Sequence, residues 1–144
     1  MIRLLSLLPL LVCIPTSASG ETLPGPIPAE VIRIVDGDTV RVRAHIWINQ
    51  SIEISVRIAG IDAPEIARPD CRAERQQADA AKAEVSALIG ADMVRLYNVR
   101  LGKYAGRVVA DIKAANGTDI ATQLVALDLA IPENTDAHWC PATR

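Results

Sequence analysis

The sequence predicts a mainly β domain with added helices (α+β). Five short runs are rich in Val and Ile, and most of them alternate apolar with polar side chains, as half-buried strands do. These runs are residues 31–35, 39–43, 52–58, 93–97 and 107–112. Asp36, Gly37 and Asp38 separate the first two runs, and residues 49–51 separate the next two, both with the composition of tight turns. The front half is therefore predicted to be a three-stranded antiparallel meander.

Helical periodicity in two later segments completes this prediction. One helix has an apolar face made of Ala78, Ala81, Val85, Leu88 and Ile89, and it closes at Gly90. Polar side chains off that face include Glu74, Lys82 and Glu84. A short second helix is expected after an Asp119 N-cap, with Ile120, Leu124 and Leu127 on its buried side. Three strands, a helix, two strands and a helix is the order of a five-stranded OB-fold β-barrel with helical additions.

The composition fits one domain of this kind. The chain has 144 residues, half of them hydrophobic, which is enough for a single core and argues against disorder. Because there is no Phe, and only two Trp and two Tyr, the core must be built from Val, Ile, Leu and Ala. We assign residues 30–131 to the domain. The Pro-rich residues 21–29 are expected to be a linker, and residues 132–144 an unpatterned tail.

Residues 1–20 are typical of a signal peptide for export. Arg3 supplies a positive start, residues 4–14 are one apolar run, and small residues follow up to a predicted cleavage point near Ala18. The apolar run is short for a bilayer, so an uncleaved membrane anchor is the weaker alternative. We expect a periplasmic or extracellular monomer with no stable membrane association after cleavage.

Cleavage would leave two cysteines, Cys71 and Cys140. An even pair in an oxidising compartment favours a structural disulfide, which would tether the tail near the loop that follows Glu65. The alternative is a zinc site that uses both cysteines with His138, and with His45 as a further ligand. That spacing fits no common zinc signature.

The charge balance gives no bulk attraction for a polyanion. The full chain carries a formal charge of −2, and loss of Arg3 would make it −3. If this protein binds nucleic acid, local Arg and Lys side chains and a metal ion must supply the attraction.

Two predicted turns concentrate acidic side chains. Asp36 and Asp38 flank a glycine, and Asp62 and Glu65 lie within Ile-Asp-Ala-Pro-Glu. Carboxylates and backbone carbonyls are the hard oxygen ligands that Ca²⁺ and Mg²⁺ prefer. Each motif taken alone is more typical of a plain turn.

Basic side chains stand close to the same turns. Arg57 ends the third predicted strand, and Lys103, Tyr104 and Arg107 cluster at the start of the fifth. Guanidinium groups suit bidentate contact with phosphate and stabilise charge that builds on its oxygens. Any one of these residues alone would be read as ordinary surface charge.

The joint pattern is far more specific than its parts. It consists of Asp-Gly-Asp-Thr-Val at 36–40, Arg-Ile-Ala-Gly-Ile-Asp-Ala-Pro-Glu at 57–65, and Lys-Tyr-Ala-Gly-Arg at 103–107. These motifs closely resemble those of the staphylococcal nuclease (thermonuclease) family, and the order of elements between them matches as well. The resemblance runs from about residue 31 to residue 130.

The resemblance implies a Ca²⁺-dependent endonuclease that hydrolyses DNA and RNA with little sequence preference and leaves 3′-phosphate ends. Asp38, Asp62 and the Ala63 carbonyl would bind the Ca²⁺, or another divalent ion, and Asp36 would support them. Glu65 would act as general base on the attacking water, or would position it. Arg57 and Arg107 would clamp the scissile phosphate. Lys103 and Tyr104 would contact a neighbouring phosphate.

The sequence departs from the family pattern at three places. Ala105 is an extra residue before Gly106, which would shift Lys103 and Tyr104 relative to Arg107. Asp128 stands where the last helix usually has Gly, and the aromatic residues that stack on bases have no clear match. The alternative function is a catalytically idle OB-fold module that binds nucleic acid or another ligand. The intact set of acids and arginines favours the enzyme.

Overall fold

A computed structural model describes residues 20–91, 93–136 and 138–141. The predicted signal peptide lies outside the described residues, apart from Gly20. Within these ranges, no helix has the length and apolar character needed to cross a membrane.

Five long strands form the barrel that the sequence predicts. They are β2 (Ile27–Ile34), β3 (Thr39–Trp47), β4 (Gln50–Ile58), β6 (Val94–Leu101) and β7 (Arg107–Lys113). β2, β3 and β4 make the predicted antiparallel meander, and β4 pairs in parallel with β7. β6 pairs with both β7 and β2 and so closes the sheet. The five-stranded OB-fold prediction is confirmed.

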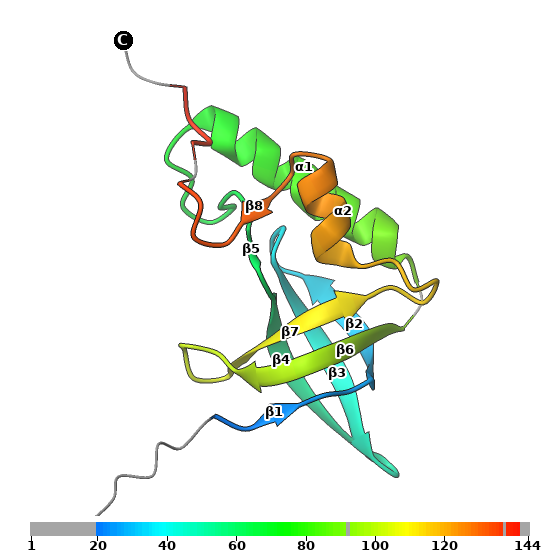
Figure 1. Cartoon of the computed structure of the whole chain (residues 1–144). Coiled ribbons are helices and arrows are strands. Elements are labelled where there is room, and N and C mark those ends of the chain that lie inside the picture. Colours follow the sequence, from blue (N-terminus) through cyan, green and yellow to red (C-terminus); the bar gives the residue numbers. More distant parts are fainter. Residues whose placement is uncertain (1–19, 92, 137, 142–144) are drawn as a thin grey trace, which may run out of the picture.

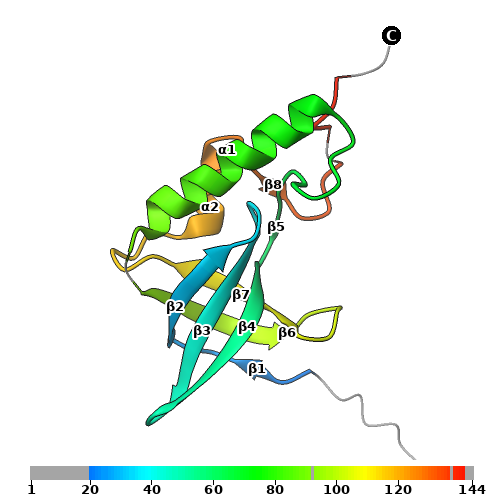
Figure 2. The ribbon, with the colours of Figure 1, turned by 180° about the vertical axis from the view of Figure 1, so that it is seen from behind.

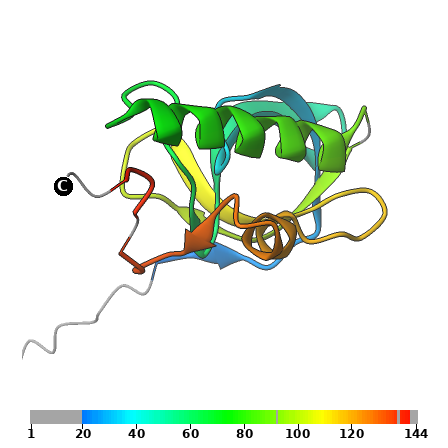
Figure 3. The same ribbon diagram turned by 90° about the horizontal axis from the view of Figure 1, so that it is seen from above.

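Two helices cover one end of this barrel (Figure 1). α1 (Arg72–Ile89) lies above β2 when the molecule is seen from behind (Figure 2), and from above it runs across the barrel end with α2 (Ile120–Ala126) beside it (Figure 3). α1 ends at Gly90, whose φ of 62° suits glycine, and Asp119 caps α2 by accepting a hydrogen bond from the Thr122 N–H. The C-terminal end of α1 and the N-terminal end of α2 are therefore as predicted.

The core is built from Val, Ile, Leu and Ala, as the composition requires. Strand residues such as Val40, Val56 and Leu96 pack with Val85 of α1 and Leu124 of α2, all of them fully buried or nearly so. Burying such side chains contributes about 1.5–3 kcal/mol each and holds the helices on the barrel.

Two side-chain predictions for the helices are wrong. Leu127 is half exposed, because α2 stops at Ala126 and Leu127 itself, with φ −97° and ψ 7°, no longer continues the helix. Glu74 lies off the apolar face in the prediction, yet it is buried with 5% exposure. Its carboxylate accepts backbone hydrogen bonds, which offset the cost of removing it from water.

The linker prediction for residues 21–29 is also wrong over most of its length. β1 (Thr22–Leu23) pairs with β6, and residues 27–29 begin β2 and pair with β6 as well. Ala29 is fully buried. Proline removes a backbone donor and fixes φ near about −65°, which edge strands tolerate, so a Pro-rich segment still forms strand where its apolar side chains can be buried and its carbonyls can accept.

Two further short strands join the end of the chain to the barrel. β5 (Ile61–Asp62) pairs with β8 (Ile131–Pro132), and the Glu133 N–H donates to the Gly60 carbonyl at 2.9 Å. The predicted disulfide between Cys71 and Cys140 is present and ties the tail to the start of α1. Because both thiols are consumed in this bond, the alternative zinc site is excluded.

Candidate active site

Strand register places the two predicted clamp arginines on one face of the sheet. Ser55 of β4 lies opposite Arg107 of β7, and Arg57 lies two residues further along β4. Because side chains two apart on a strand share a face, Arg57 and Arg107 point to the same side. The parallel β4–β7 pair thus joins residues far apart in the sequence.

A cavity of about 460 Å³ lies at this place, beside the β6–β7 turn. That turn is on the same side of the barrel as β5 and β8 (Figure 1). Five predicted site residues line the cavity: Arg57, Glu65, Lys103, Tyr104 and Arg107. Glu133 lines it too, although no sequence pattern points to this residue, because it belongs to the unpatterned tail. Its position follows from the pairing of β8 with β5.

Arg57 also connects the cavity to the predicted acidic residues. Its Nη1 donates to the Asp38 carboxylate at 2.8 Å, and its Nη2 donates to the Asp62 carboxylate and, at 3.3 Å, to the Ile61 carbonyl. Asp38 further accepts from the Thr39 hydroxyl at 2.8 Å and from the Ala63 N–H at 3.2 Å. The two predicted metal-binding carboxylates are therefore held on one guanidinium.

The Asp38 carboxyl is poorly neutralised in spite of these contacts. It is 5% exposed, and burial raises its pKa to about 6, although Arg57 acts in the opposite direction. The nearby charge of Asp36 raises the pKa further. Asp36 is close because its own carboxylate accepts the Asp38 N–H at 3.2 Å within the turn. The turn thus concentrates negative charge next to Arg57, which also lines the cavity.

The donor set fits a hard divalent cation. No three His, Cys, Asp or Glu side chains gather into a metal-binding group within the described ranges. The ligand set expected from the sequence needs only Asp38, Asp62 and a backbone carbonyl, with water completing the shell. Arg57 pairs with two carboxylates, those of Asp38 and Asp62, and the Asp36 carboxylate lies next to them on the Asp38 N–H. Negative charge therefore remains for a cation to neutralise.

A close approach of backbone to helix fixes the acidic turn. A Cβ added at Gly37 would lie 2.7 Å from the Ala81 Cβ of α1 and 2.8 Å from the Ala63 Cβ. Such distances leave no space for a methyl group, so glycine at position 37 lets the turn pack under α1. Because Asp38 follows Gly37 directly, this packing contact also constrains the position of Asp38.

Gly37→Ala is expected to lower the free energy of unfolding by about 1–3 kcal/mol, because a packed interior accepts an extra methyl group only by shifting backbone. Since the shift moves Asp38, activity should fall by more than the unfolded fraction explains. Urea denaturation and activity at a temperature where the variant is folded measure the two effects. Ser51→Ala, at an exposed position of β4, is the control, because that change adds no atoms to the packed turn. Equal stability of both variants would contradict the close-packed turn.

The β6–β7 turn absorbs the extra residue Ala105. The Arg107 N–H donates to the Tyr104 carbonyl at 3.3 Å, and Gly106 takes a φ of 76° that suits glycine. The Arg107 guanidinium lies over the Tyr104 ring, 4.9 Å from its centroid, and Lys103 Nζ is 5.8 Å from the same ring. The insertion therefore leaves Lys103, Tyr104 and Arg107 on one cavity.

Arg107 keeps donors available for a ligand. Its buried Nε has no hydrogen-bond partner among the described residues. A buried donor without a partner is costly, so the folded protein holds Arg107 here at some expense in stability. Tyr104 holds the guanidinium by its ring and takes none of the Arg107 N–H groups.

Tyr104→Ala is expected to lower turnover about two- to fivefold, because an exposed cation–π contact contributes about 0.5–1 kcal/mol to holding Arg107 in place. Tyr104→Phe keeps the ring and should behave like the wild type in kcat. Steady-state kinetics on one labelled oligonucleotide checks both. If Phe is as damaging as Ala, the hydroxyl rather than the ring carries the role.

Glu65 lies between β5 and α1 in a segment without helix or strand. Its N–H donates to the Glu74 carboxylate at 3.2 Å, and its side chain lines the cavity with Arg57 and Arg107. The sequence did not predict a site role for Glu74. A signal was available, since Glu74 lies four residues before Ala78 and so continues the buried face of α1.

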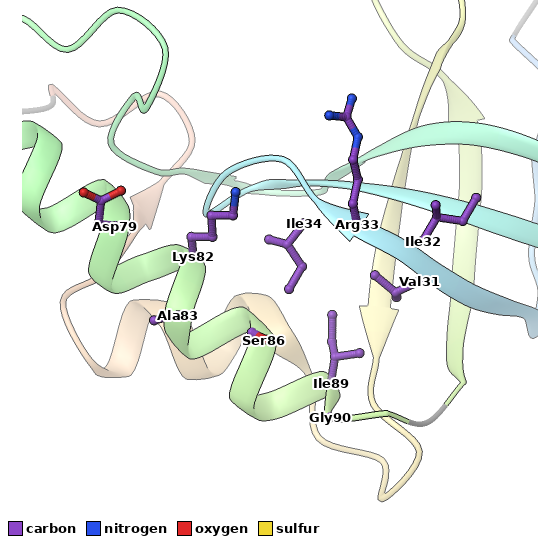
Figure 4. A pocket seen from close by; sticks show the side chains of 10 residues that line it. All are labelled: Val31, Ile32, Arg33, Ile34, Asp79, Lys82, Ala83, Ser86, Ile89 and Gly90. Carbon is purple, nitrogen blue, oxygen red and sulfur yellow. The ribbon is translucent and has the colours of Figure 1, made fainter.

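A separate groove of about 570 Å³ lies between β2 and α1 (Figure 4). Its walls are polar and apolar in nearly equal parts, with Lys82 and Arg33 as cations and Asp79 as an acid. Lys82 Nζ donates to the Val35 carbonyl at 3.4 Å. None of the predicted site residues lines this groove, so its size does not make it the candidate active site.

The barrel and its cavity define a small OB-fold protein with paired arginines beside an acidic turn. A family model described as staphylococcal nuclease homologue matches residues 55–138, and the chain belongs to this family. The matched span includes Arg57, Glu65 and Arg107, and it begins after Asp36 and Asp38. A search of curated proteins found no match to the chain.

Proposed function

We propose that this protein is an exported Ca²⁺-dependent endonuclease that hydrolyses phosphodiester bonds of DNA and RNA with little sequence specificity. The observation that carries the proposal is a single cavity lined by Arg57, Arg107 and Glu65, with Asp38 and Asp62 held on Arg57 behind it. A phosphodiester needs charge neutralisation, an aligned water and a nearby base, and this cavity offers groups for each.

Arg57 and Arg107 would bind the two non-bridging oxygens of the scissile phosphate and stabilise the charge that grows on them in the transition state. Preorganised donors of this kind typically contribute about 10²–10³ in rate each. Both guanidinium groups have the fork geometry that matches phosphate, and the Nη1 and Nη2 groups of Arg57 would turn from Asp38 and Asp62 to the substrate when a cation neutralises those carboxylates.

Glu65 would accept a proton from the attacking water, or orient that water, so that the new P–O bond forms in line with the bond that breaks. The 5′ oxygen leaves and takes up a proton, which gives a 3′-phosphate end. Asp38, Asp62 and the Ala63 carbonyl would hold Ca²⁺, with Asp36 in support. Bound there, the ion would polarise the phosphate and favour ionisation of water.

Lys103 and Tyr104 would contact the neighbouring phosphate, since both line the same cavity as Arg107. Such backbone contacts are electrostatic and independent of sequence, which accounts for a broad substrate range. They also allow a chain with a net charge of −2 to bind a polyanion locally.

The cellular setting follows from the same reasoning. A disulfide is typical of an oxidising compartment, which supports export to the periplasm or beyond the cell. We further propose that the mature protein is a monomer, that residues 1–20 are removed, and that it does not stay on a membrane.

The test is cleavage of 5′-labelled single- and double-stranded DNA and of RNA by the purified mature chain. Each substrate is incubated with Ca²⁺, with Mg²⁺ and with a chelator, and the products are analysed for 3′-phosphate ends. Cleavage with Ca²⁺ and none with chelator is expected. Cleavage that requires a different ion would overturn only the assignment of Ca²⁺. Binding of the polymers without cleavage in any ion would establish the idle-module alternative instead.

A further inference from the structure

The candidate base Glu65 sits in a segment that has no regular structure of its own. Residues 63–71 connect β5 to α1 without helix or strand. A carboxylate on such a segment holds a fixed position only if other parts of the molecule bind the segment. At the start of the segment, the Ala63 N–H donates to the Asp38 carboxylate at 3.2 Å and Pro64 is fully buried. From Glu65 onward, the contacts come from the first turn of α1.

Glu74 provides two of these contacts through one carboxylate. Its Oε1 accepts the Glu65 N–H at 3.2 Å, and its Oε2 accepts the Asp70 N–H at 2.6 Å. The two oxygens therefore bind the backbone near both ends of the segment. A third contact comes from the next residue, since Arg75 Nη1 donates to the Ile66 carbonyl at 3.1 Å.

Glu74 is itself firmly held. It is buried in the first turn of α1, where a negative charge interacts favourably with the helix dipole. Its own N–H is bound by the Sγ of Cys71, the N-cap residue that the disulfide joins to Cys140. A small cavity of about 160 Å³, lined by Glu74 with Asp70 and the tail residues 138–140, is the space left beside it.

We propose that Glu74 is a positioning residue that holds Glu65 at the distance from the scissile phosphate that proton transfer requires. This inference rests on the proposed nuclease function and adds to it a residue that does not touch the substrate. Two backbone N–H groups require two acceptor oxygens, and among the common side chains only a carboxylate offers both at this spacing.

The expected signature is a loss of kcat with little change in KM. Glu74 contacts the segment that carries the base and does not line the cavity with Lys103, Tyr104 and Arg107, so substrate binding should persist. A misplacement of about 1 Å at a reacting group can cost about 10²-fold in rate. Glu74→Ala is therefore expected to lower kcat about 10- to 100-fold.

The test compares Glu74→Ala, Glu74→Gln and the matched control Glu84→Ala, a glutamate on the same helix without contact to the segment. Glu74→Gln keeps one acceptor oxygen, so its kcat should lie between those of the wild type and Glu74→Ala. Both Glu74 changes are then made in a Glu65→Gln background. There they should lower the remaining activity no further, because the group they position is already lost, whereas any effect on thermal unfolding should persist.

Equal fold losses of kcat in the wild-type and Glu65→Gln backgrounds would overturn the proposal, as would a rise in KM alone. Wild-type kcat in folded Glu74→Ala would overturn it as well. An inactive wild type is a separate result, because it removes the nuclease function on which the proposal rests.

Discussion

Arg57→Ala is expected to lower kcat on DNA about 10²- to 10³-fold, the typical effect of losing one preorganised donor to the transition state. The same change should destabilise the protein by about 1–3 kcal/mol, since it leaves the buried Asp38 carboxylate without its cationic partner. Asp38 has 5% exposure and Arg57 is its nearest cation, at 2.8 Å. One side chain therefore serves both the proposed chemistry and the folded state.

Two variants separate these effects. Arg57→Lys keeps the charge and so should recover most of the stability, but it lacks the fork that contacts two oxygens and should stay well below wild-type kcat. Arg41→Ala is the matched control, because Arg41 lies on the neighbouring strand and contacts only Ser55 among the described side chains. Urea denaturation and steady-state kinetics measure both quantities. Full activity in a folded Arg57→Ala protein would contradict the clamp.

Asp38→Asn is expected to remove most activity and at the same time to stabilise the metal-free protein above pH 6. Losing one of the two carboxylates proposed to bind the metal should cost at least about 10² in rate. The stability effect has the opposite sign because burial raises the Asp38 pKa from 3.8 to about 6. The folded protein therefore binds this proton more tightly than the unfolded chain does.

The sign of the pH dependence follows directly. Stability from this group is greatest below the unfolded pKa of 3.8 and falls as the pH rises to about 6, where the folded carboxyl ionises. The shift corresponds to about 3 kcal/mol. Asparagine avoids this penalty but gives Arg57 a weaker partner, so a net gain of about 1–2 kcal/mol is expected at pH 8 and none near pH 4.

Urea denaturation with a chelator at pH 4 and pH 8 checks this expectation. Asp136→Asn, which removes an exposed carboxylate, is the control and should change stability little at either pH. If Asp38→Asn is destabilising to the same extent at both values, the Asp38 carboxylate is well compensated in the folded state. The conclusion that the negative charge of the acidic turn is incompletely neutralised would then be wrong.

The barrel could be predicted from sequence because its information is local. Period-two alternation, the Asp-Gly-Asp turn and the apolar face of α1 each specify an element from a few neighbouring residues, and the order of elements then limits the topology. That Arg57 and Arg107 share one face of the sheet could also be predicted, because it follows from the β4–β7 pairing that this barrel requires.

The features that escaped prediction depend on distant contacts. Pro-rich residues 21–29 read as a linker until β6 is available to pair with them. Glu74 reads as a solvent-exposed acid until the backbone of residues 65 and 70 supplies its donors. Glu133 enters the cavity only because β8 pairs with β5. The amino acids next to these residues in the sequence do not indicate their distant partners.

Glu65 and the two cavity arginines are the residues that we propose make this chain a phosphodiesterase. The most direct measurement is the rate at which wild type and Glu65→Gln, at equal concentration in Ca²⁺, convert supercoiled plasmid to nicked circles. If Glu65 acts as the base, the wild type nicks the plasmid and the variant does so at a rate about 10²–10⁴-fold lower. Equal rates, or no nicking by a folded wild type, would contradict this proposal.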